Sequence, residues 1–134
     1  MRLTRAHLLA ILWTCGILAA SLLPASSFGS MSIDTILPID KIVHFTFYFG
    51  FVILWLLALP SYSLRTRILV LFIGIVLGAF MEVLQLQMRV GRSFDIADIG
   101  ANSLGAVSGI WLIPFIGRTL PLVKKYLPFL RKVY

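Results

Sequence analysis

Four long apolar segments constrain this chain more than any other feature of its sequence. They cover Ala6–Leu23, Ile42–Leu59, Ile68–Leu86 and Ile99–Ile116. A helix that crosses the hydrocarbon core of a bilayer, which is about 30 Å thick, needs about 20 apolar residues, and slightly shorter runs fit a thin bilayer. Because lipid cannot pair with backbone polar groups, helices are the economical structure for such runs. The sequence therefore predicts an all-α membrane protein, a four-transmembrane-helix bundle that residues 1–134 form as a single domain.

The composition points the same way and excludes two other classes of protein. Hydrophobic residues make up 60% of the chain and charged residues 13%, against roughly 25% charged residues in a globular domain. The formal net charge is +7, but the basic residues gather in loops and tails and form no groove interleaved with aromatic residues, so no nucleic-acid partner is expected. With Cys15 as the sole cysteine, a disulfide framework and a CxxC redox pair are excluded.

The distribution of lysine and arginine predicts the orientation of the segments. Positive charge favours the cytoplasmic side of a membrane. With the N-terminus inside, nine basic residues fall on the cytoplasmic side, namely Arg2, Arg5, Arg65, Arg67, Arg118, Lys124, Lys125, Arg131 and Lys132. Three fall outside, namely Lys41, Arg89 and Arg92. Both termini are therefore expected to be cytoplasmic, with residues 117–134 as a basic tail on the anionic inner leaflet.

The first segment has a second interpretation. The MRLTR that precedes it and the PASS that follows it are typical of a signal peptide. However, the apolar run is long for a signal peptide, and no clean small-x-small cleavage site follows it. We therefore favour an uncleaved helix.

The polar residues within the segments are predicted to lie at one depth. Residues three or four apart share a face of a helix, and three segments have such a polar face near the outer end. These faces hold Asp40, His44 and Tyr48 with Lys41 beside them, then Glu82, Gln85 and Arg89, then Asp98 and Asn102. From the rise per residue, they form one layer about 5–6 Å below the outer surface. An ionisable group inside a membrane indicates function by default, and Glu82 is expected to pair with Lys41, His44, Arg89 or Arg92.

The stretch RSFDIADIGAN, from Arg92 to Asn102, begins the last segment. Asp95 is predicted to be the helix N-cap, and Asp98 stands at the third helical position, as in a capping box. Both carboxylates suit the positive end of the helix dipole. Capping explains neither Arg92 nor Asn102, so we assign these two residues, together with Asp98, to the polar layer.

Two glycine pairs continue the polar faces towards the inner side. They are Gly74-x-x-x-Gly78 and Gly105-x-x-x-Gly109. Small residues four apart allow membrane helices to approach closely. Since the glycine faces are also the polar faces, this packing is expected to bring the polar groups together.

Taken together and in order, these residues resemble the VanZ-like family of bacterial membrane proteins. The matching positions are DK..H...Y at Asp40, Lys41, His44 and Tyr48, E..Q at Glu82 and Gln85, and R..D..D...N..G...G at Arg92, Asp95, Asp98, Asn102, Gly105 and Gly109. The resemblance covers roughly residues 38–110. It implies a multi-pass protein of the bacterial cytoplasmic membrane with a role in the cell envelope. The family is named for a protein associated with reduced susceptibility to teicoplanin-type glycopeptides, and it supplies no settled reaction.

The first hypothesis is an outward-facing site that binds or processes a cell-envelope precursor or a lipid headgroup. Glu82, His44 and Asp98 are the candidate acid–base catalysts. The candidate substrate-binding residues are the basic Lys41, Arg89 and Arg92, which suit phosphate or carboxylate, and the polar Asp40, Tyr48, Gln85 and Asn102. A divalent cation on Asp95, Asp98 and Glu82 is conceivable through oxygen ligands, although no metal or cofactor motif supports it.

Two alternatives come from other classes of protein. In the first, the protein is a non-enzymatic accessory membrane protein, and the polar layer is an ion-paired network that fixes helix register or binds a partner. In the second, it is a transporter or proton relay. We rank that last, because four spans are few for a carrier and the inner halves of the segments contain almost no ionisable group. Whether the protein is an enzyme stays open on the sequence.

Overall fold

A computed structural model of the chain describes residues 4–23, 39–61, 63–88 and 94–126. Within these residues it contains four α-helices and no strand. They are α1 (Arg5–Leu22), α2 (Ile39–Ala58), α3 (Leu64–Met88) and α4 (Ile96–Tyr126). Each helix has a stretch that is long and apolar enough to cross a membrane, which in α4 is Ile96–Ile116. The prediction of an all-α membrane protein with four spanning helices is confirmed.

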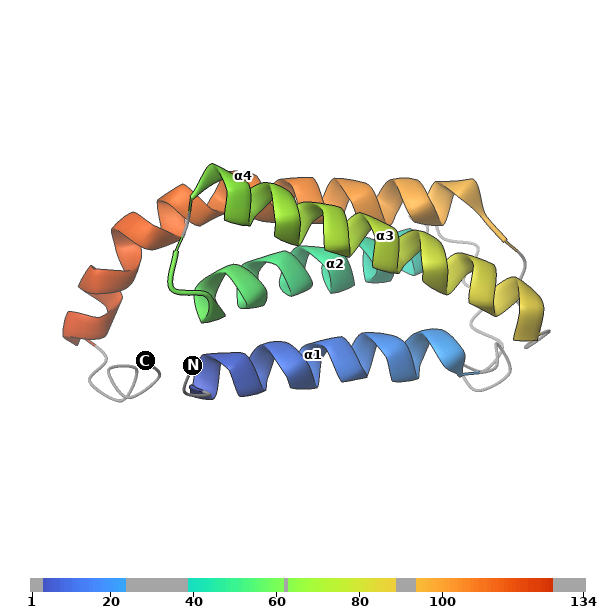
Figure 1. Ribbon diagram of the computed structural model, residues 1–134, viewed down its shortest axis with the longest axis horizontal. Helices are drawn as coiled ribbons and strands as arrows, with labels where there is room; N and C mark the ends of the chain where they lie inside the picture. Colours follow the sequence, from blue (N-terminus) through green and yellow to red (C-terminus); the bar gives the residue numbers. More distant parts are fainter. Residues whose placement is uncertain (1–3, 24–38, 62, 89–93, 127–134) are drawn as a thin grey trace.

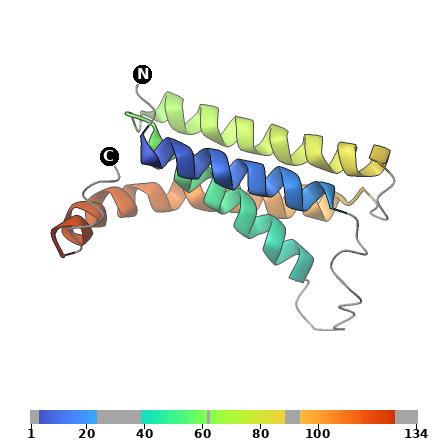
Figure 2. The same ribbon diagram turned by 90° about the horizontal axis from the view of Figure 1, so that it is seen from below.

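Helix α2 is the centre of the bundle. It contacts α1, α3 and α4, and its contact with α4 is the most extensive of all (Figure 1). The start of α2, the end of α3 and the start of α4 lie together at one end of the bundle, on the right in Figures 1 and 2. The polar ends of these three helices are therefore neighbours, although they are far apart in the sequence.

The bundle is apolar on the outside and partly polar on the inside. Large apolar side chains such as Leu64, Ile96 and Trp111 are 72%, 74% and 81% exposed. The buried residues, by contrast, include seven polar or charged ones, His7, Ser21, His44, Glu82, Gln85, Asp98 and Asn102. Since a water-soluble protein keeps such groups at its surface, this distribution suits a protein whose exterior contacts lipid.

The glycines of α4 place its backbone directly on α2. A Cβ added at Gly105 would overlap the carbonyl oxygen of Phe45, and one added at Gly109 would lie 3.0 Å from Cβ of Val52. On α3, a Cβ at Gly78 would lie 3.0 Å from Nδ2 of Asn102, whereas Gly74 leaves ordinary contact distances. Three of the four glycines therefore stand at close approaches between helices, as their spacing predicts.

Three helices are longer than their apolar segments. Helix α2 begins at Ile39, three residues before the predicted Ile42. Helix α3 begins at Leu64, four residues before the predicted Ile68, because Ser63 caps it: the Oγ atom of Ser63 accepts a hydrogen bond from the backbone N–H of Thr66 at 3.2 Å. Helix α4 continues past the predicted end at Ile116 to Tyr126 and so includes part of the basic tail. It contains Pro114 and Pro121, which lack a backbone donor, and its final part, red in Figure 1, turns away from the bundle.

Candidate functional site

Seven polar residues meet where the start of α2, the end of α3 and the start of α4 adjoin. We call them the polar cluster, and they are Asp40, Lys41, His44, Glu82, Asp95, Asp98 and Asn102. The cluster has an outer part around Lys41 and an inner part beneath His44. It contains each of the three candidate catalytic residues predicted from the sequence.

Lys41 is the centre of the outer part. Its Nζ atom donates hydrogen bonds to Oδ2 of Asp95 at 2.5 Å and to Oδ1 of Asp98, and it lies 3.6 Å from Oδ2 of Asp40. The hydrogen bond from Lys41 lowers the pKa of Asp95, which stands just outside α4, below its usual value. This ammonium group therefore connects the first turn of α2 to the N-terminus of α4.

Asp95 has the geometry of an N-cap, because its Oδ1 atom accepts a hydrogen bond from the backbone N–H of Ala97 at 2.8 Å. The carboxylate of Asp98 accepts a hydrogen bond from Lys41, as expected of a residue in the polar layer. A charged donor forms a stronger hydrogen bond with a carboxylate than a neutral backbone N–H does.

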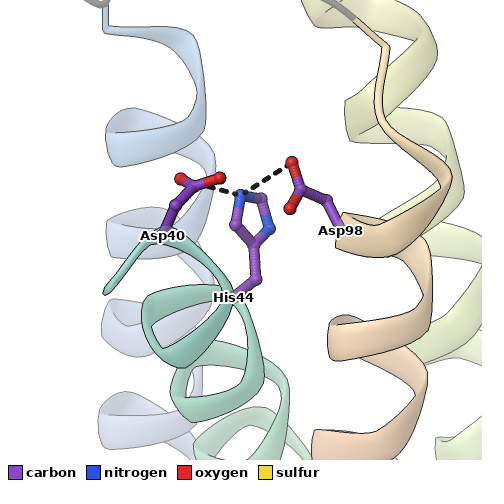
Figure 3. A group of neighbouring side chains, drawn as sticks. All are labelled: Asp40, His44 and Asp98. Carbon is purple, nitrogen blue, oxygen red and sulfur yellow. Dashed lines mark ion pairs between the residues drawn. The ribbon is translucent and has the colours of Figure 1, made fainter. Parts of the chain in front are cut away.

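His44 connects the outer part of the cluster to the inner part. Its Nε2 atom lies 3.8 Å from Oδ1 of Asp40 and 3.8 Å from Oδ2 of Asp98 (Figure 3). Its Nδ1 atom forms a 3.0 Å hydrogen bond with Oδ1 of Asn102 and lies 3.8 Å from Oε1 of Glu82. The two ring nitrogens thus face two chemically different environments, one with two carboxylates and one with an amide and a carboxylate.

The inner part of the cluster holds polar atoms that lack partners among the described residues. Glu82 is fully buried, and neither of its carboxylate oxygens has a hydrogen-bond partner there. The same is true of Nδ2 of Asn102 and, in the core beneath the cluster, of the Tyr48 hydroxyl. A buried polar group without a partner costs about 1–3 kcal/mol, so a partner for these atoms, from the rest of the chain or from a bound group, would stabilise this inner part.

Of the other predicted site residues, two are described by the structure and lie outside the polar cluster, namely Gln85 and Tyr48. Gln85 is buried and donates from Nε2 to the backbone oxygen of Ser21 at 2.9 Å, so it ties α3 to α1. Tyr48 is 1% exposed and packs in the apolar core beneath the cluster, with its ring centroid 6.4 Å from that of Phe51. Arg89 and Arg92 lie outside the described residues.

Ser21, which the sequence did not predict as a site residue, is the partner of Gln85. The feature that could have indicated it is its position, since it is a polar residue near the outer end of the first apolar segment.

The possible metal ligands that lie together in the structure are not the set expected from the sequence. Asp40, His44 and Asp98 each offer a ligand atom, and these atoms lie within 4.8 Å of one another. The set predicted from the sequence was Asp95, Asp98 and Glu82. In the structure Asp95 binds Lys41, and Glu82 lies beside the opposite nitrogen of the His44 ring.

Comparison with known proteins assigns the chain to a family. The family model described as VanZ/LLP1 matches residues 5–117, which is well over half of the sequence. No curated protein and no solved structure matches the chain. The matched region contains all four spanning stretches and the whole polar cluster. The chain therefore belongs to the VanZ/LLP1 family and is a VanZ-like multi-pass membrane protein.

Proposed function

We propose that the polar cluster is an outward-facing site in the bacterial cytoplasmic membrane that binds or processes a cell-envelope precursor or a lipid headgroup. The proposal rests on the position of Glu82. This side chain is fully buried, and its carboxylate oxygens have no hydrogen-bond partner among the described residues. Its Oε1 atom lies 3.8 Å from Nδ1 of His44. A charged side chain at the centre of a membrane helix costs about 2.5–3.5 kcal/mol on insertion scales, and less towards the helix ends, where Glu82 stands. An ionisable side chain inside a membrane helix therefore indicates a functional site, here one that binds a ligand.

The gradient of exposure across the cluster suits a headgroup that approaches from the outer surface. The side chains of Asp40 and Asp95 are 55% and 43% exposed, whereas those of His44 and Glu82 are 8% and 0% exposed. A polar headgroup would meet the exposed carboxylates first while its acyl chains stay against the apolar exterior of the bundle. Glu82, His44 and Asp98 would move protons, and Lys41, with Arg89 and Arg92, would hold phosphate or carboxylate.

An accessory, non-enzymatic role is the competing proposal, and one observation favours it. Lys41 and Gln85 each join helices through hydrogen bonds, from α2 to the start of α4 and from α3 to α1. Part of the polar layer thus holds the bundle together. Glu82 separates the two proposals, because its carboxylate lies 3.8 Å from Nδ1 of His44 and can be neutralised by glutamine with little change of shape.

Glu82→Gln is expected to abolish the rescue of a deletion strain, with a loss of about tenfold or more in the restored trait. Glutamine has nearly the same shape but cannot exchange a proton or carry charge. The rescue is scored by susceptibility to teicoplanin-type glycopeptides and by profiles of lipids and cell-wall precursors. Membrane abundance of the variant is measured in parallel and is expected to match that of the wild type.

Gln87→Ala is the matched control, because Gln87 is an exposed residue on the same helix, and it is expected to rescue fully. Full rescue by Glu82→Gln and by Asp98→Asn would refute the proposed site. A precursor that accumulates or disappears in the deletion strain indicates processing. An unchanged profile together with a lost trait indicates binding in an accessory role.

We further propose that both termini are cytoplasmic, which places the polar cluster on the outer side. The basic residues support this orientation. In a Cys15→Ser background, a membrane-impermeant thiol reagent added to intact cells is expected to label Phe94→Cys, beside the cluster, and not Ser61→Cys, between α2 and α3. Permeabilised cells are expected to label both. Labelling of Ser61→Cys and not Phe94→Cys in intact cells would reverse the orientation and contradict an outward-facing site.

A further inference from the structure

We propose that Asp40, His44 and Asp98 form a binding site for one first-row divalent cation such as Zn²⁺ or Mn²⁺. The first support is distance. Nitrogen and oxygen ligands of Zn²⁺ lie about 2.0–2.2 Å from the ion, so two ligands on one ion are about 3.0–4.2 Å apart. Nε2 of His44 lies 3.8 Å from an oxygen of Asp40 and 3.8 Å from an oxygen of Asp98. The three residues offer ligand atoms that all lie within 4.8 Å of one another, so the two carboxylates need to approach each other only slightly to share one ion. In Figure 3 the ring nitrogen stands between the two carboxylates.

The hydrogen bond on the other side of the ring supplies the second support. Oδ1 of Asn102 faces Nδ1 of His44 at 3.0 Å. An amide oxygen only accepts, so Nδ1 carries the hydrogen, and in the neutral ring Nε2 then presents a lone pair. That lone pair faces two carboxylates, an arrangement of three acceptors that a shared cation stabilises. Histidines that bind metals typically donate their other N–H to an oxygen acceptor, as His44 does here.

The spacing leaves room for an ion among the three groups. Both carboxylate oxygens lie at the same distance from Nε2, 3.8 Å, which is beyond hydrogen-bond length. A shared cation would lie between the three ligand atoms and bind each of them directly.

Lys41 positions both carboxylates for this role. It binds Oδ1 of Asp98 and lies 3.6 Å from Oδ2 of Asp40, so the remaining oxygen of each carboxylate faces His44. Lys41 is a positioning residue and contributes no ligand atom, because it holds the proton that makes it a donor.

The ligand set selects the class of ion. One imidazole and two carboxylates suit Zn²⁺ or Mn²⁺, whereas Mg²⁺ prefers a shell of oxygen atoms. Because the side chain of Asp40 is exposed, a bound ion would be accessible on that side to water or to an anionic headgroup. The contact with a headgroup rests on the proposed function, whereas the binding of the ion does not.

The test is metal binding by the purified full-length chain in lipid nanodiscs after treatment with a chelator. Calorimetry with Zn²⁺ and Mn²⁺ is expected to give one ion per chain, and Co²⁺ is expected to produce visible ligand-field bands. His44→Gln and Asp40→Asn are expected to weaken Zn²⁺ binding about 100-fold, and Asn102→Ala about tenfold. Asp40 is exposed, so its variant tests the site without disturbing the buried packing.

His7→Gln is the matched control for His44→Gln, because His7 is also a buried histidine but lies at the start of α1, outside the polar cluster. It is expected to bind Zn²⁺ as the wild type does. The proposal is overturned if the wild type binds no ion, if His7→Gln weakens binding as much as His44→Gln, or if His44→Gln leaves the affinity and the Co²⁺ spectrum unchanged. If the wild type binds no metal ion but Glu82→Gln still abolishes rescue, the metal site is refuted and the proposed function is not.

Discussion

Gly105→Ala is expected to destabilise the protein by about 3 kcal/mol, although it adds a single methyl group. The added Cβ would overlap the carbonyl oxygen of Phe45 and lie 2.9 Å and 3.1 Å from the C and Cα atoms of that residue. These are backbone atoms of α2 and cannot rotate away as a side chain does. The methyl group therefore forces α2 and α4 apart at the most extensive contact in the bundle.

The same change is expected to disrupt the polar cluster, because Lys41 and His44 on α2 contact Asp98 and Asn102 on α4. Stability is measured by the loss of helical circular dichroism as detergent-solubilised protein is titrated with sodium dodecyl sulfate. Zn²⁺ affinity of the folded fraction is expected to fall with it.

Gly100→Ala on the same helix is the control. A Cβ at Gly100 meets nothing within 4 Å, and alanine favours a helix over glycine by about 1 kcal/mol. Gly100→Ala is therefore expected to leave stability unchanged or to raise it. Equal unfolding midpoints for Gly105→Ala and the wild type would show that α2 and α4 do not approach as closely as in this structure.

Lys41→Met is the second change expected to have a large effect, a loss of about 3 kcal/mol. Methionine preserves most of the apolar length and removes the ammonium group. Asp98, which is 6% exposed, then stays buried without its charged donor, and the cost is that of an uncompensated buried charge. Asp95 contributes little to the loss, because it is exposed and water can replace Lys41.

A double-mutant cycle measures this coupling. The variant with both Lys41→Met and Asp98→Asn is expected to recover part of the stability, since the neutral amide does not need the ammonium group. The unfolding midpoints of the four proteins of the cycle are compared by the same titration. If Asp98→Asn brings no recovery, the stabilising role of Lys41 lies outside its pair with Asp98.

The features that could be read from the sequence are those that depend on one helix at a time. The four-residue spacing of Asp40 and His44, and of Asp98 and Asn102, placed each pair on one face, and the structure brings both faces into one cluster. Asp95 was identified as an N-cap from its position before an apolar run, and it accepts the bond from Ala97. These inferences require only helical periodicity and local hydrogen bonding.

The partners across helices could not be read in this way. The sequence offered Lys41 or His44, with two arginines, as partners of Glu82. In the structure Lys41 binds Asp95 and Asp98, and His44 lies 3.8 Å from Glu82. Gln85, expected to contact substrate, binds the backbone of Ser21 on α1. Periodicity tells which residues share a face, but the rotation of each helix and the neighbour that it meets depend on packing.

By itself the sequence determined the number of spanning helices, their all-α class and the family resemblance, and it predicted a polar layer at one end of the bundle. These follow from the hydrophobic thickness of a membrane and from the 3.6-residue turn, which act on each segment independently. The tertiary structure decided which residues of the polar layer contact one another. Close approach at Gly105 and Gly109 places α4 on α2, so Lys41 holds two aspartates, His44 stands between Asp40 and Asp98, and Glu82 is enclosed without a hydrogen-bond partner among the described residues. Distances of this kind arise only when helices pack, because contacts between distant segments depend on the shape of both surfaces.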